Sequence, residues 1–218
     1  MNNCLLCLQP LKVEVSWHIK WVFETKQICC SKCFANFEPL EGPLCEICSK
    51  ESVNTTCLDC QNKSSSLDSN KSLYRYNDFA KAYMRRYKFQ GDYVIGAIFQ
   101  NELKRLLVQG DTIVVPIPVS TERKLERGFN QTTGMLRQAG IKYEELLARK
   151  HSEKQSKKTR KERLEREQVF YLQKEGRYQQ TEVILFDDIY TTGSTLNLAS
   201  QELKKVGVKK VTAVTIFR

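Results

Sequence analysis

The stretch Val183–Thr195 reads VILFDDIYTTGST, and it decides the fold of this chain. Apolar residues that end in two acids, followed by small hydroxyl residues around a glycine, are typical of a buried strand that turns into a helix. We expect the strand at 182–186, the loop at 187–193, the helix at 194–206 with Gly207 as its stop, and a second strand at 210–217. This βαβ unit predicts a parallel sheet with a ligand site at the carboxyl end of its strands.

The chemistry of this loop suits a ribose phosphate. Backbone N–H groups at a helix N-terminus, aided by side-chain hydroxyls, form a nest for an anion. The nest residues are Thr191, Thr192, Gly193, Ser194 and Thr195. Asp187 and Asp188 precede the nest, where carboxylates can accept hydrogen bonds from ribose hydroxyls and help to hold a Mg²⁺-bound sugar. An ordinary strand-to-helix turn with polar caps is the alternative interpretation.

Upstream of this unit, the pattern predicts the rest of one α/β domain. The run TIVVPIPV is continuously apolar, as in a strand buried on both faces, so the predicted fold class is α/β with a twisted, mostly parallel sheet. The other predicted elements are helices at 79–87 and 99–107 around a break at 90–92, the strand at 112–119, a helix at 130–138, and short strands at 145–149 and 169–172.

The cysteines belong to a separate module. All nine lie within the first 60 residues, and eight form the C-x-x-C pairs Cys4/Cys7, Cys30/Cys33, Cys45/Cys48 and Cys57/Cys60. Two such pairs supply four thiolates to one tetrahedral Zn²⁺, so the sequence predicts two structural zinc sites in a double zinc ribbon at 1–62. Sequential and cross-braced pairing both remain open, while Cys29 and His18 are expected to be bystanders. The polar, serine-rich stretch 63–70 is predicted as a linker, and 71–218 as the α/β domain.

Charge and hydropathy limit the partners and the location. The chain carries a formal charge of +10, and residues 63–218 hold 30 basic against 18 acidic residues. This excess suits phosphate-bearing partners, although ordinary solubility charge is an equal alternative. With no secretory signal and no apolar run of about 20 residues, we expect a cytoplasmic protein without membrane insertion.

Two resemblances follow from these motifs. The segment Val183–Thr195 resembles the PRPP (5-phosphoribosyl-1-pyrophosphate) motif of type I phosphoribosyltransferases. Together with VVPIPV at 114–119, RGFNQ at 127–131, KFQGD at 88–92 and the four C-x-x-C pairs, it is similar to the ComF family of late competence proteins over essentially the whole chain.

The resemblance implies PRPP with Mg²⁺ as ligand, and Asp187, Asp188 and Arg127 as catalytic residues. It also implies a pyrophosphate-side loop, for which guanidinium groups are chemically suited. The expected residues of this loop are Pro118, Val119, Ser120, Arg123, Lys124, Arg127 and Gly128. The basic stretch Arg149–Arg166 corresponds to a mobile loop that closes over the site, but Arg166 stands where the family pattern suggests an Asn.

The ComF resemblance further implies a role in DNA uptake with single-stranded DNA as a partner. Lys157, Lys158 and Lys161 are the expected phosphate contacts, and Tyr74, Tyr76, Tyr83, Tyr87 and Phe89 are compatible with base stacking, although such spacing also suits a core. Two alternatives remain: an active transferase acting on a nucleobase or another small acceptor, and a PRPP-sensing regulator whose zinc ribbons contact a DNA-uptake or helicase-type protein.

Overall fold

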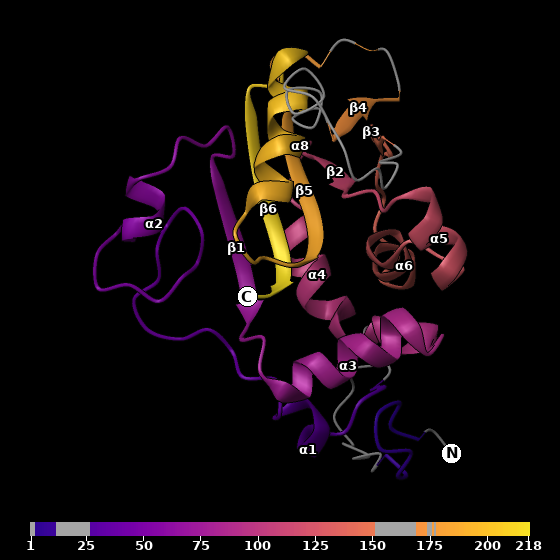
Figure 1. Ribbon diagram of the computed structural model, residues 1–218. Helices are drawn as coiled ribbons and strands as arrows, with labels where there is room; N and C mark the ends of the chain where they lie inside the picture. The colour runs from indigo at the N-terminus through magenta and orange to yellow at the C-terminus, as the bar shows by residue number, and fades with distance from the viewer. Residues whose placement is uncertain (1–2, 12–26, 151–168, 174–175, 177) are drawn as a thin grey trace, which may run out of the picture.

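A four-stranded parallel sheet forms the centre of the computed structural model, which describes residues 3–11, 27–150, 169–173, 176 and 178–218 (Figure 1). The strands follow the order β1-β6-β5-β2. They are β1 (Ser69–Tyr74), β6 (Lys210–Phe217), β5 (Glu182–Ile189) and β2 (Ile113–Pro116). The α/β class and the parallel sheet predicted from the sequence are confirmed.

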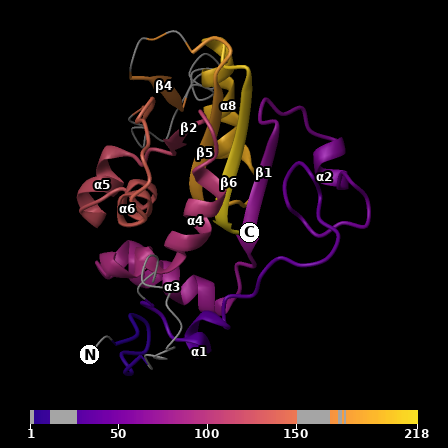
Figure 2. The ribbon, with the colours of Figure 1, turned by 180° about the vertical axis from the view of Figure 1, so that it is seen from behind.

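Helices cover both faces of this sheet. On one face, α8 (Ser194–Lys205) packs Leu196, Ala199 and Leu203 against the inner strands (Figure 1). The opposite face, turned to the viewer in Figure 2, carries α4. The elements of that side are α3 (Asp78–Phe89), the 3₁₀ helix η1 (Tyr93–Phe99), α4 (Gln100–Leu107) and α6 (Gln131–Gln138). Because both faces are buried, the inner strand β5 contains the apolar run VILF, and the edge strand β2, from TIVVPIPV, is buried from Val114 to Pro116.

Five shorter elements complete the described chain. The helix α5 (Thr121–Arg127) was not predicted, and it forms because the Ser120 side chain accepts a hydrogen bond from the N–H of Arg123. The predicted short strands are β3 (Leu147–Arg149) and β4 (Phe170–Leu172), which form a separate antiparallel pair. The cysteine-bearing segments contribute α1 (Ser31–Phe34) and α2 (Leu58–Gln61).

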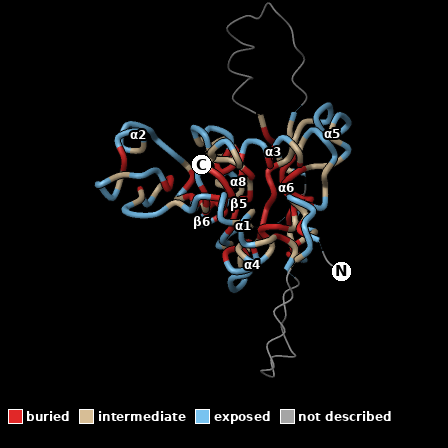
Figure 3. Tube along the Cα trace, turned by 90° about the horizontal axis from the view of Figure 1, so that it is seen from below, coloured by how far each residue is buried: buried red, intermediate tan, exposed pale blue. Residues whose placement is uncertain are grey.

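The cysteine-rich segment shares the main core. Phe37 lies between the two cysteine groups in sequence, is 2% exposed, and packs its ring 4.9 Å from Phe99 and 5.3 Å from Tyr83. Viewed from below, the buried residues gather along the sheet and α6, whereas the segment around α2 extends away with an exposed surface (Figure 3). The two cysteine groups therefore contact the α/β domain in different places.

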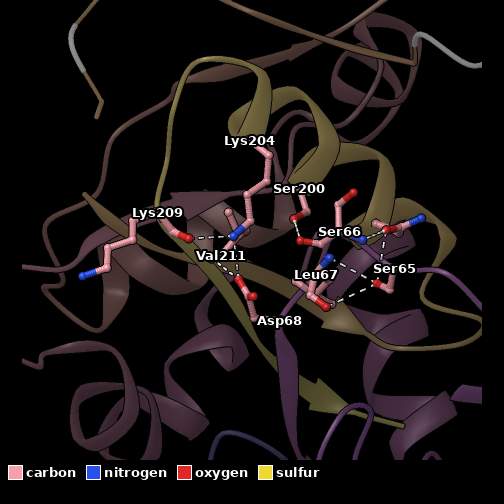
Figure 4. A network of polar contacts seen from close by, with 9 residues as sticks. Ser65, Ser66, Leu67, Asp68, Ser200, Lys204, Lys209 and Val211 are labelled. Atoms are coloured by element: carbon pink, nitrogen blue, oxygen red, sulfur yellow. Dashed lines mark hydrogen bonds and ion pairs between the residues drawn. The ribbon is translucent and has the colours of Figure 1, made fainter. Parts of the chain in front are cut away.

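Residues 65–68 are bound to the α/β domain, although 63–70 was expected to be an exposed linker. Ser200 Oγ donates to the Ser66 carbonyl at 2.6 Å, and Asp68 accepts from the Lys204 ammonium and the Val211 N–H (Figure 4). The strand β1 then begins at Ser69 and was missed. Its sequence SNKSLY carries buried Asn70 and Ser72 where an apolar side chain signals a strand, and their polar groups bond to neighbours instead.

Candidate functional site

The two adjacent acids lie at the carboxyl end of β5, next to the end of α3. Asp188 is 3% exposed and forms an ion pair with Lys88, whose side chain is 15% exposed. Gln131, at the start of α6, donates its Nε2 to Asp188 Oδ1 at 3.2 Å. Three elements distant in sequence therefore meet at one carboxylate, which is thereby fixed in position.

The carboxyl of Asp187 has a strongly raised pKa. Burial raises its pKa well above the usual value of a carboxyl, and the neighbouring Asp188 charge raises it further. The Asp188 N–H donates to Asp187 Oδ1 at 2.9 Å, and the Lys88 charge partly opposes the rise. Ionising both of two carboxyls this close costs free energy because their negative charges repel each other. The pair therefore favours a ligand that brings hydroxyl donors or a cation.

An arginine and an exposed aromatic ring extend the site. Arg127 donates to Gln131 Oε1 at 2.8 Å, and its guanidinium lies 5.0 Å from the ring centroid of Phe89, which is 62% exposed. Its Nε is buried and has no hydrogen-bond partner in the part of the chain that the structure describes. An unpaired donor on a charged group favours an anion at this position.

The loop after β5 has the geometry of an anion nest. Gly193 adopts φ +76°, a left-handed conformation that favours glycine, and as the N-cap of α8 it offers no side chain to the helix. The N–H of Ser194, the first helical residue, donates to Thr192 Oγ1 at 3.4 Å. Thr192 Oγ1 and Ser194 Oγ lie 2.9 Å apart at the entrance of the helix. The nest residues Thr191 to Thr195 are thus brought together after Asp187 and Asp188, at the N-terminus of α8, where helices favour anions.

The predicted pyrophosphate-side residues surround α5. Pro118 and Val119 follow β2, and Ser120 caps the helix, whereas Arg123 and Lys124 lie on its exposed surface. Gly128 ends the helix at φ +78°. A cavity of about 440 Å³ lies between α5, α6 and the β3–β4 pair, and Lys124, Arg137 and Arg149 line it. Lys157, Lys158 and Lys161 lie outside the described residues.

The cysteines form two tetrads in sequential pairing. One tetrad is Cys4, Cys7, Cys30 and Cys33, and the other is Cys45, Cys48, Cys57 and Cys60, with the sulfurs of each tetrad within 4.8 Å of one another. A tetrahedral site with Zn–S of about 2.3 Å needs sulfurs about 3.8 Å apart. Two sulfur–sulfur distances fit this value: Cys7 Sγ and Cys30 Sγ are 3.8 Å apart, and Cys48 Sγ and Cys57 Sγ are 3.7 Å apart. Each tetrad could therefore hold one zinc ion.

The tetrads are built as structural repeats of one another. The N–H of Cys30 donates to Cys4 Sγ and that of Cys57 donates to Cys45 Sγ, both at 3.3 Å. Cys30 and Cys57 each occupy the N-cap of a one-turn helix. Burial opposes ionisation of Cys4 and Cys45, yet backbone N–H donors outweigh it and lower the pKa of each to about 6, which suits a metal-binding thiolate.

Cys29 is separate from this arrangement. Its thiol is buried, and burial together with the charge on Cys4 raises its pKa to about 12. Its Sγ donates to the Cys30 carbonyl at 3.6 Å and it belongs to neither tetrad, in agreement with the prediction of a bystander.

Lys88 and Gln131 were not predicted to hold Asp188, although both belong to motifs singled out in the sequence. A lysine that follows a helical apolar pattern gives no sign of its partner 100 residues later. Of the aromatic residues for which base stacking and a core position were alternatives, Tyr74, Tyr83 and Tyr87 lie in the core, Tyr76 is partly buried and Phe89 is exposed.

Comparisons with known proteins show which family the chain is similar to. A family model described as the phosphoribosyl transferase domain matches residues 125–218. The chain is 34% identical to Competence protein ComFC of Streptococcus pneumoniae, with 99% of this chain and 100% of that protein covered. It is also 34% identical to Competence protein ComFC of Bacillus subtilis, with 99% and 94% covered.

Among solved structures, a hypoxanthine phosphoribosyltransferase from Staphylococcus aureus aligns with 57% of this chain and 62% of its own length. The aligned parts are 15% identical with a TM-score of 0.34, which is below the level at which two folds are called the same. No helix in the described ranges is long and apolar enough to cross a bilayer.

Proposed function

The chain belongs to the ComFC family of competence proteins, and from this premise we propose that it binds PRPP with Mg²⁺ and handles single-stranded DNA during DNA uptake. The observation that carries the PRPP part is the pairing of an anion nest with two acids. Thr191–Thr195 offers backbone donors to the 5-phosphate, while Asp187 and Asp188 face the ribose hydroxyls and the metal.

The other end of the ligand would lie near α5. The buried, unpaired Nε of Arg127 is a charged donor suited to a pyrophosphate oxygen, and Arg123 and Lys124 add positive charge on the same helix. The ligand therefore spans from the nest to α5 across the acids.

Calorimetric titration with PRPP and Mg²⁺ tests this proposal. Asp187→Asn combined with Asp188→Asn should weaken binding far more than the single change Lys124→Ala, because an exposed lysine supplies only a screened charge. Equal losses from both variants would contradict the assignment of the acids. Ribose 5-phosphate serves as a second titrant, since it reaches the nest but lacks the pyrophosphate.

The DNA part rests on family membership and on the position of Phe89. Its exposed ring beside Arg127 is a stacking surface next to the acids, and the basic stretch Arg149–Arg166 supplies charge for phosphates. Log affinity for single strands should then fall with log salt by roughly 0.7 per phosphate contacted. Lys157→Glu, Lys158→Glu and Lys161→Glu together should flatten this slope without changing the zinc content. Absence of binding even at low salt would refute direct DNA handling.

A second candidate, catalytic transfer of the ribose phosphate, is favoured by a cavity beside the loop. The cavity measures about 400 Å³ and is lined by Ile47, Leu67, Tyr190 and Asn197 along with loop residues, a size and mixture suited to a small planar acceptor. Release of pyrophosphate from PRPP on addition of a nucleobase or single-stranded DNA is the assay that separates transfer from binding. The reduced thiols of both tetrads favour a cytoplasmic location for either role.

A further inference from the structure

Tyr190 connects the second cysteine tetrad with the phosphate loop. It is the residue after β5, and its N–H donates to the Phe217 carbonyl at 2.8 Å. Among the described apolar residues that pack against the buried Cys45, Cys48 and Cys57, Tyr190 is the one that comes from the α/β domain. The ring therefore contacts the metal-binding segment directly.

The other end of the same side chain lies beneath the turn of the loop. A Cβ atom at Gly193 would overlap the Tyr190 hydroxyl and ring, so the phenol fills the space that a side chain at position 193 would occupy. Thr191 and Thr192, the residues between them, are exposed. The left-handed turn at Gly193 is thus supported from one side by Tyr190, and this turn directs the N–H groups of the nest.

Arg218 fixes the orientation of Tyr190 relative to the tetrad. Its guanidinium lies 4.8 Å from the ring centroid of Tyr190, and its Nη1 donates to the Cys48 carbonyl at 2.5 Å. Its backbone is held by Tyr74 and Tyr76, with the Arg218 N–H donating at 2.9 Å and its carbonyl accepting at 2.7 Å. The contact with the Cys48 carbonyl depends on where the segment Cys45–Cys60 holds its backbone, and the same guanidinium lies against the Tyr190 ring.

We infer that Tyr190 and Arg218 are positioning residues that make the shape of the phosphate loop depend on metal in the second tetrad. The inference rests on the proposed phosphate-binding role of the loop. When bound, zinc would hold four thiolates together and so fix the Cys48 carbonyl, which orients Arg218 and through it Tyr190. Since coupling between two sites is reciprocal, a phosphate ligand on the loop must also strengthen metal retention at this tetrad.

Hydrogen exchange of the unliganded full-length protein tests the positioning role without requiring PRPP to bind. In Arg218→Ala, peptides covering 190–195 should exchange about tenfold faster, because a hydrogen bond and a cation–π contact are lost. Peptides of α4 should be unchanged and the zinc content should remain that of the wild type. Tyr190→Ala should match Arg218→Ala.

Arg75→Ala is the matched control, because Arg75 forms an ion pair with Glu51 of the same cysteine segment, on its exposed surface. Unchanged exchange in Arg218→Ala, or equal acceleration in Arg75→Ala, would overturn the inference.

Zinc extraction by a zinc-selective chelator supplies the reciprocal test, with Mg²⁺ present throughout. PRPP should slow the release of one of two zinc equivalents in wild type and of neither in Arg218→Ala. If PRPP binds the wild type and slows neither release, the coupling is refuted. If PRPP does not bind at all, the proposed ligand is refuted, and the exchange experiment still decides the positioning role.

Discussion

Replacing Lys88 with Met should expose the energetic cost of the two adjacent acids. Lys88 and Asp188 are 15% and 4% exposed at their side chains, so little solvent screens their ion pair. Removing one partner of a buried pair costs about 3 to 5 kcal/mol, because the remaining charge is left without compensation. Gln131 still donates to Asp188 in the variant, so we expect a loss of stability at the lower end of this range, about 3 kcal/mol.

The loss should also depend on pH. Lys88 lowers the pKa of Asp187, so its removal lets burial and the Asp188 charge raise that pKa further. A carboxyl with a raised folded-state pKa binds its proton more tightly when folded, and stability therefore falls as the pH rises from the unfolded value of about 3.9 through the folded value. Lys88→Met should consequently lose more stability at about pH 7 than at about pH 5.

Urea unfolding in zinc-containing buffer measures this change. Lys81→Met on the same helix is the control, since Lys81 pairs with Asp78 through side chains that are 57% and 99% exposed, and no measurable change is expected. Asp188→Asn added to Lys88→Met should recover part of the loss by removing the uncompensated charge. A destabilisation below about 1 kcal/mol at neutral pH, or no recovery in the double variant, would refute the reasoning.

Three further outcomes are expected. The affinity for PRPP with Mg²⁺ should fall as the pH is lowered from about 8 to about 6, because the raised pKa of Asp187 means that protons compete with the ligand, and calorimetry on Asp187→Asn should show a weaker dependence. Gly193→Ala should lower the free energy of unfolding by at least about 1 to 2 kcal/mol, the cost of a left-handed alanine, with unfolding by urea as the measurement. Elemental analysis should find about two zinc equivalents in the wild type and about one in Cys57→Ser, whereas loss of both metals would contradict independent tetrads.

Local patterns were sufficient to predict the centre of the fold. The strands of the βαβ unit from Glu182 to Phe217 are mostly apolar, its helix has an amphipathic period, and β2 is an apolar run that ends at Pro116. Such patterns are visible from neighbouring residues in the chain. The four C-x-x-C pairs follow from the same kind of local regularity, whereas the structure decides that they combine sequentially. β1 could not be predicted in this way, because its buried Asn70 and Ser72 are stabilised by residues elsewhere in the chain.

In the candidate site too, features that are contiguous in sequence were predicted, whereas contacts between distant elements were not. The acids and the nest were predicted because they are contiguous in sequence, and their roles toward PRPP remain predictions. The contacts of Asp188 with Lys88 and Gln131, and of Tyr190 with the cysteine segment, depend on how distant elements pack. Phe37 gives a further example, since nothing in its neighbourhood signals that a residue between two metal-binding pairs completes the main core.

The position of β1 at the edge of the sheet has a consequence for synthesis of the protein. Ser72 bonds to Thr215 across 143 residues, so β1 has no strand partner until β6 has left the ribosome. An unpaired strand edge invites aggregation during that interval. The outer edge of β1 is already occupied by its own neighbours in sequence, because the Asn70 N–H donates to the Ile47 carbonyl and Ser49 bonds to both Asn70 and Ser72. A cysteine segment that closes around metal early in translation would shield this outer edge, so that only the edge facing β6 waits for the rest of the chain.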